Sequence, residues 1–318
     1  MNKEDLKIVF FGTPEFAVAS LDRLVKEGYN VKGVVTMPDK IGGRGHKVIK
    51  SDVKIYAEEH DLPLLQPEKL KSEEFIAKLR EIDADLFIVI AFRMLPEVVW
   101  AMPRLGTFNL HASLLPKYRG AAPINRAIMN GETETGLTTF FLQHEIDTGD
   151  MIEQRRIGIS DSDNAGTIHD RLMNLGAEVT VETVKKIIDG NLTTTPQPEG
   201  EFIPAPKIFR EDCIIDWHQP SEKIHNQIRG LSPYPSAVTT LLDEAGREID
   251  LKIFESKLSD EIKGGKETGE VTSDGKRMWV TTGDGMLEIL SLQPAGKKRM
   301  ETGAFLLGYH PKRMKTDN

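Results

Sequence analysis

The first forty residues alternate between apolar and amphipathic stretches. An apolar run at 7–11 is followed by a helical pattern at 15–26 and by a second apolar run at 31–36, with turn residues between them. Short apolar runs are typical of strands, and apolar positions at helical spacing are typical of a surface helix. The pattern predicts a β-α-β unit.

The next seventy residues repeat this order. A helical pattern at 72–79 precedes the continuous apolar run Leu86–Ala91, and we expect a further strand at 107–111. A strand that is apolar at every position is typical of a parallel sheet covered on both faces. We therefore expect an α/β fold with a doubly wound, mostly parallel, Rossmann-like sheet, which binds ligands beyond the carboxyl ends of its strands.

A long helical pattern at 164–189 and a proline-rich stretch divide the chain. Four prolines between 196 and 206 favour an extended, semi-rigid segment. We expect a first domain at 1–190, a linker at 191–210 and a small, OB-like β-barrel at 211–318. The elements of the barrel domain are expected as a helix at 221–229 and strands at 237–242, 250–254, 278–282 and 286–292.

The composition is that of an ordinary globular protein, with 39% hydrophobic and 28% charged residues in a chain of 318. No apolar run approaches the ~18 residues needed to cross a bilayer, and no secretory signal is visible, so we expect a cytoplasmic protein with no membrane partner. The single cysteine, Cys213, excludes an internal disulfide and a thiolate metal site. We expect it to fill the core.

The charge distribution narrows the class of partner. A formal net charge of −8 excludes a protein that coats nucleic acid through a broadly basic surface. Two basic islands stand out, with five cations at 40–54 and six at 297–315. An acidic protein with two such islands is suited to one specific polyanion.

Two glycine-containing segments lack the full nucleotide-binding motifs. Gly12-Thr13-Pro14 has one of the three glycines of a dinucleotide-binding loop, and we interpret it as a turn that leads into a helix. The segment 42–45 lacks the Lys-Ser/Thr ending of a Walker loop. This segment is either a surface loop without a binding role or a loop that binds the phosphate backbone of a nucleic acid.

Asn109 and His111 lie two residues apart on the strand expected at 107–111, so their side chains share one face. An asparagine amide donates to a developing oxyanion, and a histidine donates or accepts a proton near neutral pH. The pair therefore suits acyl chemistry. Spacing alone equally allows a structural pair that bonds the strand's backbone.

Asp147 follows in the turn at 146–150, between two apolar runs. An aspartate in a turn usually bonds the backbone two residues on. If it instead reached His111, its carboxylate would favour the charged imidazolium and would accept a proton through water. His144 competes for the histidine role, but it has no second polar partner in register.

Taken together, these motifs and several others resemble the methionyl-tRNA formyltransferase family, and the resemblance covers nearly the whole chain. It rests on the segments Phe11–Phe16, Thr36–Arg44, Asn109–Pro116, Tyr118–Ile124, Asp147–Met151, Pro233–Pro235, Gly283–Gly285 and Leu290–Lys298. The block at 109–116 resembles folate-dependent formyltransferases in general, whereas the motifs beyond the linker resemble this family's carboxyl-terminal barrel.

The resemblance implies a formyltransferase-type Rossmann-like catalytic domain in which Asn109, His111 and Asp147 are catalytic. It implies that the co-substrate is 10-formyltetrahydrofolate and that no metal takes part. Four consecutive residues would line the folate site, namely Ser113, Leu114, Leu115 and Pro116. At 91–96 the chain reads Ala-Phe-Arg-Met-Leu-Pro, where family members commonly have Ala-Tyr-Gly and a longer link to the Leu-Pro pair.

The implied reaction moves a formyl group to the α-amino group of methionyl-initiator tRNA, through a tetrahedral intermediate stabilised by Asn109 and protonated His111. The inserted loop at 37–50 would approach the acceptor end of the tRNA, and the linker and barrel would contact its backbone more distantly. The implied tRNA-binding residues are Arg44, Lys47, Lys207, Lys297 and Lys298. We expect a monomer.

Two other functions fit parts of this pattern. A formyltransferase for an amino sugar nucleotide, or a hydrolase releasing formate from the folate, would use the same catalytic domain. The loop with Arg44 and the barrel argue against both. A catalytically silent RNA-binding protein is disfavoured because Asn109, His111 and Asp147 are all present.

Overall fold

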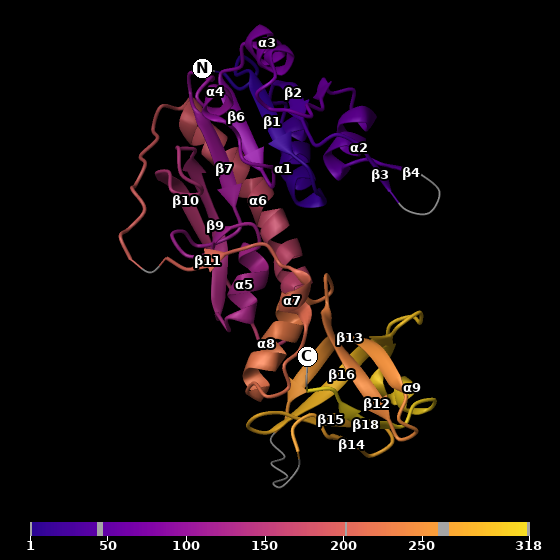
Figure 1. The fold of residues 1–318 in the computed structure, drawn as a ribbon. Coiled ribbons are helices and arrows are strands. Elements are labelled where there is room, and N and C mark those ends of the chain that lie inside the picture. Colours follow the sequence, from indigo (N-terminus) through magenta and orange to yellow (C-terminus); the bar gives the residue numbers. More distant parts are fainter. Residues whose placement is uncertain (1, 43–46, 201, 260–266, 317–318) are drawn as a thin grey trace. The chain divides into compact units, whose positions relative to one another are not determined.

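The computed structural model describes residues 2–42, 47–200, 202–259 and 267–316 (Figure 1). The chain forms two compact units. The first comprises Met1–Gly120, Thr135–Ile157 and His169–Pro204, and the second comprises Ala121–Glu134, Gly158–Ile168 and Ala205–Asn318. Two short stretches of the predicted first domain, 121–134 and 158–168, therefore belong to the second unit, and the domain boundaries at 190 and 210 stay a prediction.

A seven-stranded sheet forms the centre of the first unit. Its order is β10-β9-β7-β6-β1-β2-β5, and the run from β7 to β5 is parallel, whereas β9 pairs antiparallel with β7. This confirms the predicted doubly wound, mostly parallel sheet. The strands are β1 (Ile8–Gly12), β2 (Val31–Val35), β5 (Leu64–Leu65), β6 (Leu86–Ile90), β7 (Thr107–His111), β9 (Glu134–Phe141) and β10 (Met151–Gly158).

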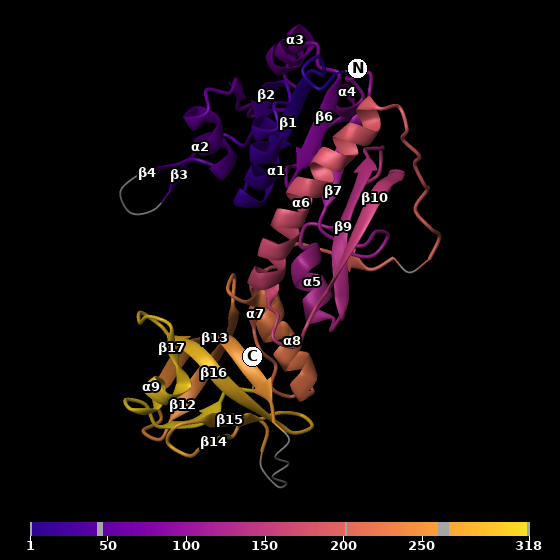
Figure 2. The same cartoon turned by 180° about the vertical axis from the view of Figure 1, so that it is seen from behind.

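The longest helix, α6 (Ala165–Ile188), packs against β7 and β9 and passes in front of β7 in Figure 2. At Gly176 a Cβ atom would lie 2.8 Å from a methyl of Leu110 in β7, so a larger residue there would displace the Leu110 side chain. None of the helices in the described ranges is long and apolar enough to cross a membrane. α6 begins in a stretch of the second unit. The helices that lie wholly within the first unit are α1 (Glu15–Lys26), α2 (Asp52–Glu59), α3 (Glu73–Ile82) and α4 (Glu97–Trp100).

Two pairs of short strands lie outside this sheet. β3 (Lys40–Gly42) and β4 (Lys47–Ile49) pair antiparallel, so the inserted loop expected at 37–50 carries a β-hairpin stem. Ile41 and Val48 on this stem are 73% and 59% exposed. β8 (Arg119–Gly120) pairs with β11 (Pro204–Ala205).

The second unit contains the predicted small β-barrel. Its strands follow the order β14-β15-β16-β13-β12-β18, and a bridge between Glu270 and Arg313 joins the two ends, so the antiparallel barrel is nearly closed. Trp217 and Phe305 are fully buried in its core, and Cys213 is 6% exposed there, as expected. Its elements are α5 (Pro123–Met129), α7 (Arg210–Cys213), α8 (Ser221–Leu231), β12 (Ala237–Asp243), β13 (Glu248–Leu258), β14 (Val271–Ser273), β15 (Met278–Thr281), β16 (Met286–Pro294), β17 (Met300–Glu301), α9 (Thr302–Leu306) and β18 (Pro311–Met314).

Candidate active site

Strand β7 presents Asn109 and His111 on one side of the sheet, because side chains two residues apart share a face. The strand is hydrogen-bonded to β6 on one side and to β9 on the other, and these two pairings fix its position. The His111 side chain is 8% exposed, and Asn109 is half-buried. Within the described residues, the amide of Asn109 has no hydrogen-bond partner, which leaves its donor for a ligand.

The two ring nitrogens of His111 have different partners. Nε2 donates to the main-chain oxygen of Tyr118 at 2.8 Å, since a carbonyl can only accept. Nδ1 faces Oδ2 of Asp147 at 3.8 Å. Because Nε2 is already engaged, Nδ1 is the nitrogen that remains for chemistry.

Asp147 lies in the connection between β9 and β10 and has a left-handed backbone conformation, with φ of 54°. Its side chain is 11% exposed, and Oδ2 accepts from the main-chain N–H of Gly120 at 2.9 Å. The carboxylate is therefore tied to β8 and lies beside His111. The competing histidine, His144, is exposed on the surface with Nε2 3.5 Å from Glu97.

Positive φ values occur at two residues that contact His111 or face it, and at one residue that follows β6. Ala91 after β6, Tyr118 and Asp147 have φ of 47°, 61° and 54°. Residues other than glycine adopt this conformation at a cost, and such strained residues cluster at functional sites. The strain therefore supports the location of the site at the carboxyl ends of β6 and β7.

The residues predicted to line the folate site are partly interior. Ser113 and Leu115 are 0% and 3% exposed, whereas Leu114 and Pro116 are half-buried. The hydroxyl of Ser113 donates to the main-chain oxygen of Lys117 at 2.7 Å. Ser113 therefore uses its hydroxyl within the loop, and the folate-lining role of all four residues stays a prediction.

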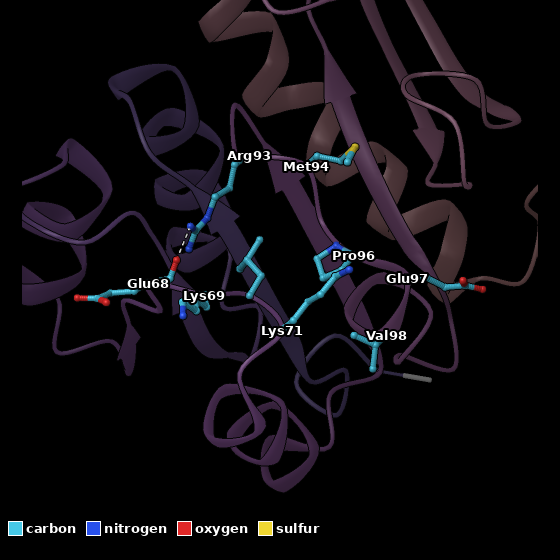
Figure 3. A pocket seen from close by; sticks show the side chains of 9 residues that line it. Glu68, Lys69, Lys71, Arg93, Met94, Pro96, Glu97 and Val98 are labelled. Atoms are coloured by element: carbon cyan, nitrogen blue, oxygen red, sulfur yellow. Dashed lines mark hydrogen bonds between the residues drawn. The ribbon is translucent and has the colours of Figure 1, made fainter.

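A pocket of about 590 Å³ opens beside the loop that follows β6 (Figure 3). Arg93 lines it and donates to the main-chain oxygens of Pro67 and Glu68, the latter at 2.8 Å. Burial lowers the pKa of the Arg93 guanidinium. None of the predicted catalytic residues lines this pocket. Its lining includes Arg93, Met94 and Pro96 from the 91–96 segment, where the sequence departs from the family pattern.

The predicted tRNA-binding residues differ in how the structure describes them. Arg44 lies outside the described residues, and Lys47 begins strand β4. Lys207 is exposed, with its ammonium 6.0 Å from the ring centre of Phe209. Lys297 and Lys298 are exposed in the turn after β16, and neither has a carboxylate partner among the described residues.

Much of the remaining charge in the two basic islands is neutralised. In the second island, Arg299, Arg313 and Lys315 pair with Glu255, Glu267 and Glu248 respectively. In the first island, Lys50 and Lys54 pair with Glu58 and Asp39, each at 2.6 Å. The islands therefore hold fewer unpaired cations than the sequence suggests.

Three contributors to the site were missed by sequence reasoning. Tyr118 and Gly120 act through their main-chain atoms, which residue type does not reveal, although both lie in a segment that carries the family resemblance. Gln197 lies in the predicted linker and donates to the main-chain oxygen of Asp147. Among the residues that the structure describes, no three His, Cys, Asp or Glu side chains come together as a metal site.

Two family models match the chain. Residues 6–184 match the model described as formyl transferase, and residues 207–310 match the formyl transferase C-terminal domain. A methionyl-tRNA formyltransferase of Bacteroides fragilis is 58% identical, over 98% of this chain and 97% of that protein. The chain belongs to the methionyl-tRNA formyltransferase family. Members from Flavobacterium johnsoniae and Porphyromonas gingivalis are 52% and 49% identical, over 96% and 97% of both chains.

Solved structures agree with this family assignment at the level of the fold. An N-formyltransferase from Helicobacter canadensis, in complex with folinic acid and dTDP-3-aminofucose, has a TM-score of 0.64 at 21% identity and covers 93% of this chain and 100% of that one. HypX from Aquifex aeolicus has a TM-score of 0.64 at 19% identity and covers 96% of this chain and 48% of its own.

Proposed function

We propose that the protein transfers the formyl group of 10-formyltetrahydrofolate to the α-amino group of methionyl-initiator tRNA. Membership of the family over nearly the full length of both chains supports this activity. The observation that carries the chemistry is the amide of Asn109, which has no partner among the described residues, on the strand face shared with His111. A cytoplasmic location and a monomeric state belong to the same proposal.

The neutral amine attacks the formyl carbon and gives a tetrahedral intermediate whose oxygen carries negative charge. Asn109 and protonated His111 donate hydrogen bonds to this oxygen, and preorganised donors of this kind stabilise the transition state more than the substrate. Since Nε2 of His111 already donates to Tyr118, the donor toward the substrate is Nδ1–H.

Asp147 accepts the proton that the attacking amine must lose. A bond forms between the α-nitrogen and the formyl carbon, the bond from that carbon to the folate nitrogen breaks, and one proton leaves the amine while another reaches the leaving nitrogen. The distance of 3.8 Å from Asp147 to His111 is longer than a hydrogen bond, which suits transfer through water or closer approach when substrate binds. The carboxylate also faces Nδ1 of His111 from the side of β8.

The tRNA is held through phosphate contacts, which position the substrate without reading its bases. Exposure and the absence of a carboxylate partner among the described residues support Lys297 and Lys298 in this role. Lys207 is supported by its exposure, and Arg44 and Lys47 are proposed from the sequence alone.

The choice of acceptor tests this function. Purified protein is supplied with 10-formyltetrahydrofolate and one of three acceptors: methionyl-initiator tRNA, a dTDP-linked amino sugar, or water alone. We expect a formylated product only with the tRNA. Formylation of the sugar, or release of formate at the same rate without an acceptor, would assign the site to one of the two rival functions.

A further inference from the structure

The extended segment after α6 lies against the candidate site. The main-chain N–H of Thr195 donates to Met151 in β10 at 2.9 Å, and its C=O accepts from Met151 at 2.8 Å. Figure 1 shows the segment beside that strand. We propose that Gln197 in this segment is a positioning residue for Asp147. This inference rests on the proposed function, because it concerns how the carboxylate is aimed at His111.

The side-chain amide of Gln197 spans the turn that contains Asp147. Its Nε2 donates to the main-chain oxygens of Asp147 and Gly149, at 2.7 and 3.0 Å. Its Oε1 accepts from Nε of Arg119 at 3.1 Å and from a second guanidinium nitrogen. Because arginine can only donate, Arg119 fixes the orientation of the amide and turns its NH₂ group toward the two carbonyls.

The backbone of Asp147 needs such support. Its left-handed conformation, with φ of 54°, costs free energy in a residue other than glycine and persists only where the surroundings hold it. Arg119 anchors the amide that holds the main chain, and the adjacent Gly120 holds the carboxylate through its N–H. Strand β8 therefore fixes both ends of Asp147, and Gln197 is the link to its main chain.

The same segment supports His111 through the backbone. The main-chain oxygen of Ile203 accepts from Tyr118 N–H at 2.6 Å, and the oxygen of Tyr118 accepts from His111 Nε2 at 2.8 Å. A side-chain substitution cannot remove these contacts. Gln197 is therefore the position at which the support can be tested by mutation.

A glutamine with the same chemistry lies in the second unit. Nε2 of Gln227 donates to the main-chain oxygens of Asp212 and Ile214, at 2.9 and 3.0 Å. Replacing either glutamine by leucine removes one amide and leaves two carbonyls without that donor. Gln227→Leu is thus a control for the loss of the two donated bonds, whereas Gln197→Leu also removes an acceptor from Arg119.

The experiment compares kcat, KM and thermal unfolding in the full chain. We expect both leucine variants to lose thermal stability, but only Gln197→Leu to lower kcat, by about 10- to 100-fold, with KM for the folate within about twofold. Gln197→Glu keeps the length of the side chain and the contact with Arg119 but cannot donate to the carbonyls. Gln197→Glu should lower kcat in the same way. It therefore replaces Gln197→Leu in the experiment if the leucine variant does not fold.

A double-mutant cycle separates positioning from a general structural effect. If Gln197 acts through Asp147, Gln197→Leu should lower kcat only slightly in an Asp147→Asn background. Unchanged kcat in both Gln197 variants, or losses that simply multiply with Asp147→Asn, would overturn the positioning role. If Asp147→Asn alone keeps wild-type turnover, the catalytic role of Asp147 fails. If the wild-type protein formylates no methionyl-initiator tRNA, the proposed function itself fails, so the failures are distinguishable.

Discussion

Asn109 is the residue on which the proposed chemistry depends most directly, because its amide is oriented by β7 and has no partner among the described residues. We expect Asn109→Ala to lower kcat by about 10²-fold or more, the usual cost of losing one oxyanion donor. KM for the folate should change little, since the lost bond strengthens only in the transition state. Steady-state kinetics measure both values.

The isosteric Asn109→Asp variant separates the loss of the hydrogen-bond donor from the loss of side-chain volume in Asn109→Ala. It keeps the size of the side chain but replaces the donor with an acceptor and adds negative charge beside the developing oxyanion. It should lose at least as much activity as the alanine variant. Near wild-type turnover in either variant would remove Asn109 from the mechanism.

Asp147 has a structural interpretation as well as a catalytic one, and a single substitution separates them. Asn in place of Asp147 can still accept from Gly120 N–H, so the fold should be preserved. Because the amide cannot accept the proton, turnover should fall and its pH dependence should change. A change confined to thermal stability would favour a plain turn residue.

At the residue scale the sequence predicted the polar side chains of the site, but not the neighbouring groups that hydrogen-bond to them. The spacing of Asn109 and His111 follows from strand geometry, and Asp147 was reached from its turn and the family resemblance. The contributions of Tyr118 and Gly120 are made by main-chain atoms, which every residue has. Gln197 lies fifty residues from Asp147 in the chain, and only the folded structure brings them together.

At the scale of elements, the Gly283-Asp284-Gly285 motif has a structural explanation. Oδ1 of Asp284 accepts from the main-chain N–H of Ser221, the first residue of α8, at 2.7 Å. A Cβ at Gly283 would lie 2.1 Å from the main-chain oxygen of His218, so the close approach of these two loops requires glycine. The motif therefore joins the start of α8 to the barrel.

This contact predicts a pH-dependent stability. The hydrogen bond from Ser221 N–H, more than any other influence, lowers the pKa of Asp284. A lowered carboxyl pKa stabilises the fold above its unfolded value of about 4, and that contribution disappears as the pH falls through the folded value. Asp284→Ala should therefore cost about 0.5–2 kcal/mol near pH 7, as loss of a helix cap does, and much less near pH 3.

Denaturant unfolding of wild type, Asp284→Ala and Asp284→Asn at both pH values measures this effect. The asparagine variant keeps an acceptor oxygen without the charge, so it should lose less than the alanine variant at neutral pH. A difference between wild type and Asp284→Ala that stays constant from pH 7 to pH 3 would contradict the capping role.

Elements with strong local patterns were predicted well, and those set by long-range pairing were not. The helix expected at 164–189 is Ala165–Ile188, because a long amphipathic pattern determines a helix almost alone. The antiparallel pairing of β9 with β7 and the hairpin stem of β3 and β4 were not anticipated. Which strands pair depends on tertiary contacts, and the spacing of apolar residues along the chain does not predict those contacts.

For the molecule as a whole, the question is how a chain with a net charge of −8 holds an RNA. Each phosphate contact releases counterions, so it adds to the steepness with which affinity falls as salt rises. Reversing the charge of Lys297 and Lys298 to glutamate should weaken methionyl-tRNA binding and flatten that salt dependence. Folate binding should stay unchanged.

A control matched for charge comes from the first unit. Lys26 and Lys78 each pair with a carboxylate one helical turn away, Asp22 and Glu74. Replacing both by glutamate changes the net charge from −8 to −12, as the double reversal of Lys297 and Lys298 does. If both pairs of reversals alter the salt slope equally, only the overall charge matters and Lys297 and Lys298 make no specific contact.

The most direct test of the whole account follows the formyl carbon itself. Enzyme in excess over methionyl-initiator tRNA is mixed with 10-formyltetrahydrofolate carrying a carbon-13 formyl group, and the methionine released from the tRNA is analysed by mass spectrometry. The account predicts one labelled formyl group on the α-nitrogen, formed at a rate that falls about 10²-fold in Asn109→Ala. Methionine without the label, or with it in equal yield and rate in the variant, would contradict it.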